Sequence, residues 1–208
     1  MTLTLRLDAE PLSRGDRHAA ADVATRAFLD DAYFAYLLPG AQFRARALPI
    51  LFGGQIGHLG RYARIVVVRD DDARIVGVAV WLTTGGFPLS LGVQIAQVPS
   101  SLRALYQRPH SLQVGGAYLR ELLNVHPKEP HWYLMLLAVE PTMQRSGVGT
   151  MLMNDGIDRI DAEHVGAYLE TQKLDNLAYY RRFGFELRDT LEPLPSGPAY
   201  YTMWRAAR

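Results

Sequence analysis

The stretch that decides the fold is residues 132–150, which read Trp-Tyr-Leu-Met-Leu-Leu-Ala-Val-Glu-Pro-Thr-Met-Gln-Arg-Ser-Gly-Val-Gly-Thr. Residues 132–139 form a nearly continuous apolar run, which is typical of a strand covered on both faces. A loop with two glycines then leads into residues 150–164, where apolar side chains recur at helical spacing. The pattern predicts a buried strand, a glycine loop and an amphipathic helix in direct succession, as in a βαβ unit.

The flanking sequence supplies further strands and helices. Residues 63–69 and 75–82 are β-branched and apolar with an aspartate cluster between them, a pattern that predicts a hairpin. From the hydrophobic periodicity and from the glycines and prolines that interrupt it, we expect helices over residues 16–29, 33–38, 43–59 and 176–183. We expect strands over residues 2–7, 167–171, 185–188 and 198–204. Residues 83–130 are broken by prolines and glycines; they predict only short helices, near residues 101–106 and 118–125, in an elaboration that shapes a pocket.

Composition narrows the function classes. The chain has 208 residues, 49% of them hydrophobic, which suits one core and predicts a single domain over residues 1–208. A net charge of +1 argues against nucleic-acid or membrane partners. The absence of cysteine excludes disulfides and thiolate nucleophiles, and the six histidines show no metal-binding spacing, so we expect no metal. No secretory signal or apolar run of about 20 residues is visible, so we expect a cytoplasmic protein.

The glycine loop has the features of an anion site. Glycines allow unusual backbone angles and close approach to a ligand, and the first amides of the following helix carry the positive end of its dipole. Arg145, Ser146 and Thr150 add further donors. The loop lacks the lysine of a phosphate-binding P-loop, and Leu152 stands where a dinucleotide fingerprint requires its third glycine. We therefore predict a pyrophosphate site of another kind; a turn whose glycines only allow close packing is the alternative.

Two motifs together resemble the GNAT superfamily of acyl-CoA-dependent N-acetyltransferases. Residues 137–152 match its Gln/Arg-x-x-Gly-x-Gly/Ala signature, and residues 176–185 match its Asn…Tyr-x-x-x-Gly-Phe ending. Within the superfamily, residues 126–134, 169–171 and 198–205 are most similar to the puromycin N-acetyltransferase group. The resemblance is clear over about residues 123–206 and thin over the first 60.

The resemblance implies a GNAT fold of α/β (mixed α+β) class. This is a central, mostly antiparallel sheet of six to seven strands, with one splayed parallel pair and flanking helices. It also implies that acetyl-CoA is the co-substrate. The residues that the family motifs place against the cofactor are Leu137, Ala138, Val139, Gln144, Arg145, Ser146, Gly147, Val148, Gly149, Thr150, Asn176 and Tyr180. Asn176 opens a helix, so an N-cap role is an equal alternative.

Tyr180 and Glu170 are the first candidates for catalysis. Tyr180 matches the family tyrosine, and a phenol can protonate the thiolate that leaves when the acyl group is transferred. Packing in the core is its alternative role, and we expect packing for Tyr179. Glu170 is the first candidate for the base that deprotonates the amine, because its strand faces the cofactor cleft in the family; a solvated strand carboxylate is the alternative. Asp30 and Asp31 come next for the same role, with a surface position as their alternative, and His131 is a weaker third candidate.

Acceptor residues are expected near the end of the first helix. Asp30 and Asp31 lie there, and Tyr33 and Trp81 are aromatic candidates for the pocket wall. Other aromatic candidates, which equally suit a core, are Phe28, Tyr36, Trp132 and Tyr168.

These features predict an enzyme, a monomer or homodimer, that transfers acetyl from acetyl-CoA directly to a primary amine of a small molecule, such as an aminonucleoside or an antibiotic. A non-catalytic acyl-CoA sensor and a protein or peptide amine acetyltransferase are the alternatives.

Overall fold

The computed structural model describes residues 8–59, 62–106, 108–194 and 196–208, and its centre is a seven-stranded sheet. The strands are β1 (Glu10–Pro11), β2 (Ala63–Arg69), β3 (Ile75–Leu82), β4 (His131–Val139), β5 (Gly166–Thr171), β6 (Glu186–Leu191) and β7 (Tyr200–Arg205). Their order is β1-β2-β3-β4-β5-β7-β6, and only β4 and β5 are parallel. This confirms the expected mixed, mostly antiparallel sheet. The strand expected at residues 2–7 lies outside the described residues.

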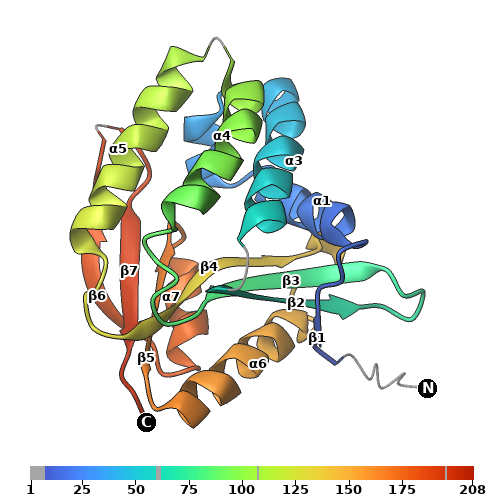
Figure 1. The fold of residues 1–208 in the computed structure, drawn as a ribbon, viewed down its shortest axis with the longest axis vertical. Coiled ribbons are helices and arrows are strands. Elements are labelled where there is room, and N and C mark those ends of the chain that lie inside the picture. The colour runs from blue at the N-terminus through green and yellow to red at the C-terminus, as the bar shows by residue number, and fades with distance from the viewer. Residues whose placement is uncertain (1–7, 60–61, 107, 195) are drawn as a thin grey trace.

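Helices cover both faces of the sheet (Figure 1). On one face lie α1 (Arg17–Phe28), α2 (Ala32–Leu37), α3 (Ala41–His58), α4 (Leu91–Leu105) and α5 (Pro109–Val125); on the other lie α6 (Val148–Glu163) and α7 (Asp175–Arg181). A short 3-10 helix, η2 (Pro141–Met143), connects β4 to α6. Among the described helices, none is long and apolar enough to cross a membrane.

Residues 83–130 are more helical than the sequence predicted. Two long helices, α4 and α5, replace the short segments expected near residues 101–106 and 118–125. Ser90 caps α4 by accepting a hydrogen bond from the Val93 amide, and Pro99 lies inside that helix. Pro109 is the first residue of α5, where no backbone N–H is needed. The interpretation of these prolines as breaks was therefore wrong, since one starts a helix and one is tolerated within it.

The sheet separates two hydrophobic cores because successive strand residues point to opposite faces. Every residue of β3 is buried, as expected for a strand with helices on both sides. On the α6 side, close packing depends on Gly156, where a Cβ would lie 2.4 Å from the Trp81 ring. Trp81 is fully buried there. The prediction that Trp81 lines an acceptor pocket is therefore wrong, because α6 covers its side chain completely.

The parallel pair separates halfway along its length. β4 and β5 are paired only from His131 to Leu134, opposite Gly166 to Leu169. Beyond Leu134, β4 continues to Val139 beside β3 alone, and Met135 forms a bulge because no β3 residue is paired with it. The second half of β4 thus has one side without a strand partner, at the point where β5 reaches Glu170.

Candidate functional site

The loop before α6 has the backbone geometry of an anion site. Gly147 precedes the helix with a φ of 98°, and Arg145 also has a positive φ, of 64°. Ser146 Oγ donates a hydrogen bond to the Met143 carbonyl at 2.6 Å, which fixes the turn. The first amides of α6, beginning at Val148, have no partner within the helix, so they face outward at its positive end.

The side chains around this loop are available to a ligand. Gln144, Arg145 and Ser146 are exposed. Gln144 Nε2 lies 3.4 Å from the carbonyl oxygen of Val139, so it covers the unpaired side of β4 where that strand ends. Together, exposed donors and outward amides fit the diphosphate of coenzyme A, whose two negative charges they would bind.

Gly149 has a steric role rather than a conformational one. A Cβ at this position would lie 2.8 Å from Tyr179 Oη, so only glycine lets Tyr179 pack under the first turn of α6. Burial raises the pKa of Tyr179 to about 12, although the nearby Thr150 hydroxyl opposes the shift. Tyr179 is therefore a packing residue of the loop, as its position in the sequence suggested.

The unpaired side of β4 offers backbone groups to an extended ligand. Glu140 N–H donates to the Val76 carbonyl at 2.8 Å, so the alternation of an antiparallel pair turns Ala138 toward β3 and Leu137 and Val139 away from it. The prediction for Leu137 and Val139 fits a pantetheine arm bound like an added strand. For Ala138 it needs correction, because the backbone groups of this residue face β3.

Asn176 is held at the end of β5. Its Nδ2 donates a hydrogen bond to Thr171 Oγ1 at 2.9 Å, and α7 begins one residue earlier, at Asp175. The N-cap alternative is thus excluded, since the helix is capped at Leu174. The side chain of Asn176 instead joins the last residue of β5 to α7, beside the gap between β4 and β5.

Tyr180 lies in the core on the α6 and α7 side of the sheet. It is 7% exposed, and burial beside Tyr179 raises its pKa above the ordinary value. The hydroxyl of Tyr180 is therefore protonated at neutral pH, which is the state that a proton donor to a leaving thiolate requires.

Glu170 is a buried carboxylate at the point where β4 and β5 separate. Only 6% of its side chain is exposed. Burial raises its pKa to about 7, opposed by the hydroxyls of Tyr133, Tyr168 and Tyr200. Glu170 Oε1, Tyr168 Oη and His126 Nδ1 are among the buried polar atoms of the described residues that have no partner within strict hydrogen-bond geometry, although the Tyr168 hydroxyl is close enough to act on the carboxylate. Leaving such groups unpaired costs about 1–3 kcal/mol each, so a further polar partner at this position would be stabilising.

The two catalytic candidates lie on opposite faces of the sheet. Glu170 follows Leu169 in β5, so it points to the same face as Tyr168, toward α1 to α5. Tyr180 packs on the other face with Leu169 and α6. The gap between the splayed strands lies between these two faces, so a group held in the gap can be reached from both sides.

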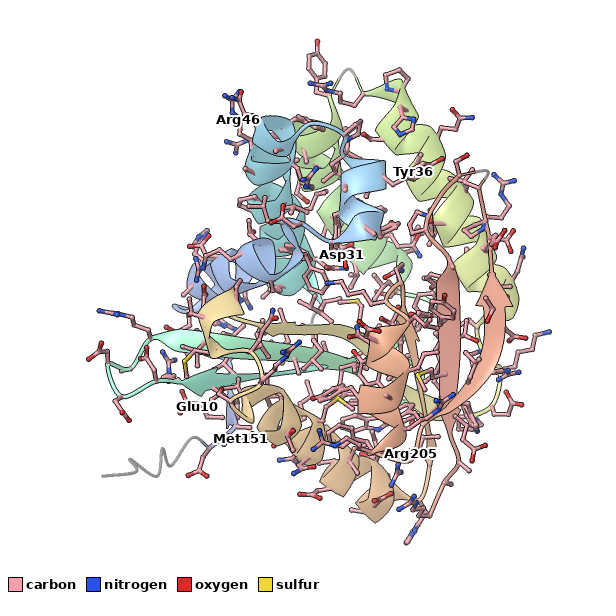
Figure 2. The ribbon with its side chains drawn as sticks, turned by 180° about the vertical axis from the view of Figure 1, so that it is seen from behind. Glu10, Asp31, Tyr36, Arg46, Met151 and Arg205 are labelled. Atoms are coloured by element: carbon pink, nitrogen blue, oxygen red, sulfur yellow. The ribbon has the colours of Figure 1, made fainter. Side chains whose placement is uncertain are left out.

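The remaining acceptor candidates separate in the structure. Asp30 has 94% of its side chain exposed. Asp31 is buried; it caps α2 by accepting from the Tyr33 amide at 3.0 Å and lies 3.5 Å from Lys173 Nζ. Figure 2 labels it at the end of α2 nearer the sheet. Tyr33 extends from the same helix, its ring 4.7 Å from that of Tyr118. Tyr33 also interacts electrostatically with Tyr133 and Tyr200, two of the tyrosines around Glu170. Asp31 pairs with Lys173, whereas Asp30 points to solvent.

Of the side chains around Glu170, the sequence pointed to Tyr168 as a pocket candidate but missed His126, Tyr133 and Tyr200. His126 Nδ1 lies 4.0 Å from Glu170 Oε1, and Tyr133 and Tyr200 face the carboxylate from β4 and β7. The five-residue spacing of His126 and His131 at the start of β4 was the only available signal. A cavity of about 240 Å³ lies beside them, lined by Thr83, Thr84, Gly85, Phe87, Pro127, Lys128, Glu129, Pro130, His131 and Tyr133. Both ends of the 83–130 segment therefore line a pocket.

Within the described residues, no group of three or more potential ligands could hold a metal ion. The arrangement places a carboxylate, Glu170, and a phenol, Tyr180, on opposite faces of the sheet beside the unpaired half of β4, so it can supply a base and an acid.

Comparison with known proteins agrees with this geometry. A model of the acetyltransferase (GNAT) family matches residues 55–185. Among solved structures, a Corynebacterium glutamicum protein described as histone acetyltransferase HPA2 and related acetyltransferase is 26% identical, with a TM-score of 0.74 over 97% of both chains.

Two more distant structures share the fold. Phosphinothricin acetyltransferase from Sinorhizobium meliloti, in complex with AcCoA, is 13% identical, with a TM-score of 0.55 over 97% of this chain and 88% of that one. The ribosomal-protein-S18-alanine N-acetyltransferase of Escherichia coli is 15% identical, with a TM-score of 0.54 over 96% and 92%. The family match spans the splayed strands, the glycine loop and both catalytic candidates, and the chain belongs to the acetyltransferase (GNAT) family.

Proposed function

We propose that this protein transfers the acetyl group of acetyl-CoA directly to the primary amine of a small molecule. The observation that carries the proposal is the position of Glu170, a buried carboxylate with a pKa raised to about 7, at the point where the parallel strands separate. A base with a pKa near the working pH is best suited to remove a proton from an ammonium or amine group.

In this reaction a residue on one face of the sheet removes a proton, and a residue on the other face donates one. Glu170 Oε takes a proton from the ammonium form of the substrate, and the neutral nitrogen then forms the bond to the acetyl carbon. Tyr180 Oη gives its proton to the sulfur as the carbon–sulfur bond breaks, and the second proton that the nitrogen loses on becoming an amide restores the Tyr180 phenol. The backbone groups of Leu137 and Val139 and the amides at the start of α6 hold the cofactor, which supplies the acetyl group. No acyl-enzyme is needed, and the chain has no cysteine to form one by a thiol.

The surroundings of Glu170 favour a small acceptor. Tyr133, Tyr168 and Tyr200 enclose the carboxylate, and tyrosine faces attract an amine cation while their hydroxyls orient it. A protein side chain would need an open groove, whereas this carboxylate is 6% exposed. The resemblance of residues 126–134 to the puromycin N-acetyltransferase group supports an acceptor of the aminonucleoside or antibiotic kind, of which only the amine end has to reach Glu170.

The test is to measure acetyl-CoA binding by calorimetry and CoA release by a thiol assay. The amines would be puromycin, agmatine and phenylethylamine, with a lysine peptide and an N-terminal peptide as the protein arm. We expect binding by the wild type, release with at least one small amine, and intact binding but about 10²-fold slower release in Glu170→Gln.

Three results would contradict the proposal. Absence of acetyl-CoA binding would remove its basis, and binding without release for every amine would indicate the acyl-CoA sensor. Release only with the peptides would indicate a protein acetyltransferase.

A further inference from the structure

Helix α4 is apolar on two opposite faces. One face packs inward, where Ala104 is buried and Val93 and Leu105 contact the core on the α1 to α5 side of the sheet. The opposite face carries a row of apolar side chains that are 47–71% exposed, the α4 row: Leu91, Ile95, Val98 and Leu102. A helix that is apolar on opposite faces is normally covered on both, so the α4 row needs a partner.

Helix α5 adds to this exposed apolar surface. Leu112, Leu119 and Leu123 are 49–54% exposed, and Tyr106, between the two helices, is 73% exposed. The two helices contact each other, and Figure 1 shows that the end of α4 and the start of α5 lie together at the side of the molecule far from the sheet. The helices therefore form an antiparallel pair with apolar side chains exposed along both members.

The size of this surface matches one half of a protein interface. Eight apolar side chains are exposed on the helix pair, and at about 100 Å² each they present on the order of 800 Å². A complex of standard size buries about 800 Å² on each partner. The largest apolar patch of a typical monomer is about 300–600 Å² and often functional. The helix pair thus has enough apolar surface for a stable complex.

The spacing of the α4 row favours a second copy of the chain as the partner. Successive members are four, three and four residues apart, the repeat along which two helices pack lengthwise. This spacing is the same in both directions along the helix. A two-fold axis near the middle of α4 therefore places Leu91 against the partner subunit's Leu102, and Ile95 against the partner subunit's Val98.

The charges of α4 disfavour other occupants. Arg103 is the only charged residue among the 15 of this helix. A helix that lies on anionic lipid or on nucleic acid needs several cations beside its contact surface. The cavity of about 240 Å³ is lined by residues that precede α4 or follow α5, so a small molecule bound there would not cover the α4 row.

We propose that two copies of this chain associate through α4, with the two α4 helices antiparallel about a two-fold axis and the α5 helices beside them. The α4 row contains no charged side chain, so the contact buries no unpaired charge. Both ends of the 83–130 segment line the cavity beside His131, so the dimer contact lies between the two stretches that form this cavity wall. The proposal does not depend on the acetyl transfer proposed above.

The first experiment is sedimentation of the full chain at about 1–100 μM, since interfaces of this size have Kd values from micromolar downward. We expect a species of twice the chain mass of 23.3 kDa. Ile95→Glu and Val98→Lys each place a charge against an apolar side chain of the partner subunit, so we expect either variant to raise the Kd of the dimer about 100-fold or more. Because both residues are exposed in the monomer, each variant should keep the circular dichroism of the wild type.

Mixing the two variants tests the antiparallel register. In a mixed dimer, the carboxylate introduced at position 95 of one chain faces the ammonium introduced at position 98 of the other, while the second contact keeps Ile95 against Val98. We therefore expect the mixture to recover most of the dimer that each variant lacks alone. Leu187→Glu is the matched control, because Leu187 is 42% exposed on β6, and this variant should sediment like the wild type.

Three outcomes would overturn the proposal. A wild type that is monomeric throughout the concentration range would leave the α4 row to a different molecule. A dimer that persists in Ile95→Glu would place the contact between copies on another face. Two monomeric variants whose mixture stays monomeric would exclude the antiparallel arrangement about the two-fold axis.

Discussion

Tyr179 and Tyr180 show how adjacent residues of one type acquire different roles. Tyr179 Oη packs under Gly149 at the start of α6, whereas Tyr180 lies in the core below the gap between β4 and β5. Adjacent positions on a helix point in directions about 100° apart, so one ring packs under the glycine loop and the other lies in the core on the α6 and α7 side of the sheet. A phenylalanine at each position in turn separates the two roles.

We expect Tyr180→Phe to lower kcat about 10²-fold, because the leaving thiolate loses its proton donor, while the KM for acetyl-CoA stays unchanged. Steady-state measurement of CoA release with the best amine of the panel tests this. Tyr179→Phe is the matched control and should retain kcat. Similar losses in the two variants, or full activity in Tyr180→Phe, would show that another group protonates the sulfur.

At the scale of elements, the start of α6 contains two glycines, and each is required for a different physical reason. Gly147 has a φ of 98°, which side chains rarely adopt, and a Cβ there would meet no atom within 4 Å. Gly149 is limited by space, because a Cβ would meet Tyr179 Oη at 2.8 Å and nothing else closer than 3.6 Å. Removal of the Tyr179 hydroxyl would therefore make room for a side chain at residue 149 but would not relieve the backbone strain of a side chain at residue 147.

We expect Gly149→Ala to destabilise the fold by about 1–3 kcal/mol through overpacking, and Gly149→Ala combined with Tyr179→Phe to recover most of that loss. Gly147→Ala should cost about 1–2 kcal/mol through backbone strain, with no recovery from Tyr179→Phe. Urea unfolding of the four variants gives the free energies. Equal behaviour of the two glycines in this cycle would contradict the assignment.

At the scale of the whole molecule, the buried carboxylate affects stability as well as chemistry. The pKa of Glu170 is about 7 in the folded protein against 4.5 for the unperturbed group. Between these pH values the folded state keeps a proton that the unfolded chain has lost. The contribution of Glu170 to stability therefore becomes more unfavourable as pH rises from 4.5 to 7, and stays constant above that range.

We expect Glu170→Gln to be more stable than the wild type by roughly 3 kcal/mol at pH 8, with the difference vanishing near pH 4.5. Urea unfolding of both proteins at several pH values measures it. Taking the difference removes contributions that both proteins share, including those of His126 and His131, which have the opposite sign because burial lowers their pKa values. Glu186→Gln, on exposed β6, is the control and should show no such trend. A constant difference across the range would mean that the pKa of Glu170 is the same in the folded protein as in the unfolded chain.

The sequence predictions were correct where the structure depends mainly on residues that are close together along the chain. The strand, loop and helix over residues 132–164 are recognisable because their apolar spacing and glycines are local. Trp81 was misplaced because its cover depends on Gly156, far along the chain. His126 was missed for the same reason, since its partner Glu170 is brought near only by the pairing of β4 with β5. Glu170 became the candidate base because the family resemblance places its strand at the cleft.

The separation of β4 from β5 also has a consequence for the purification of the protein. The unpaired half of β4 is a sheet edge, yet it lies inside the molecule, between a neighbouring strand and the turn below α6. An exposed edge of this kind would recruit strands from other chains and promote aggregation. If coenzyme A binds along this edge, as proposed above, it binds the native state and not the unfolded chain. Mass action then shifts the unfolding equilibrium toward the native state, so we expect purification and storage with coenzyme A to slow the loss of folded protein.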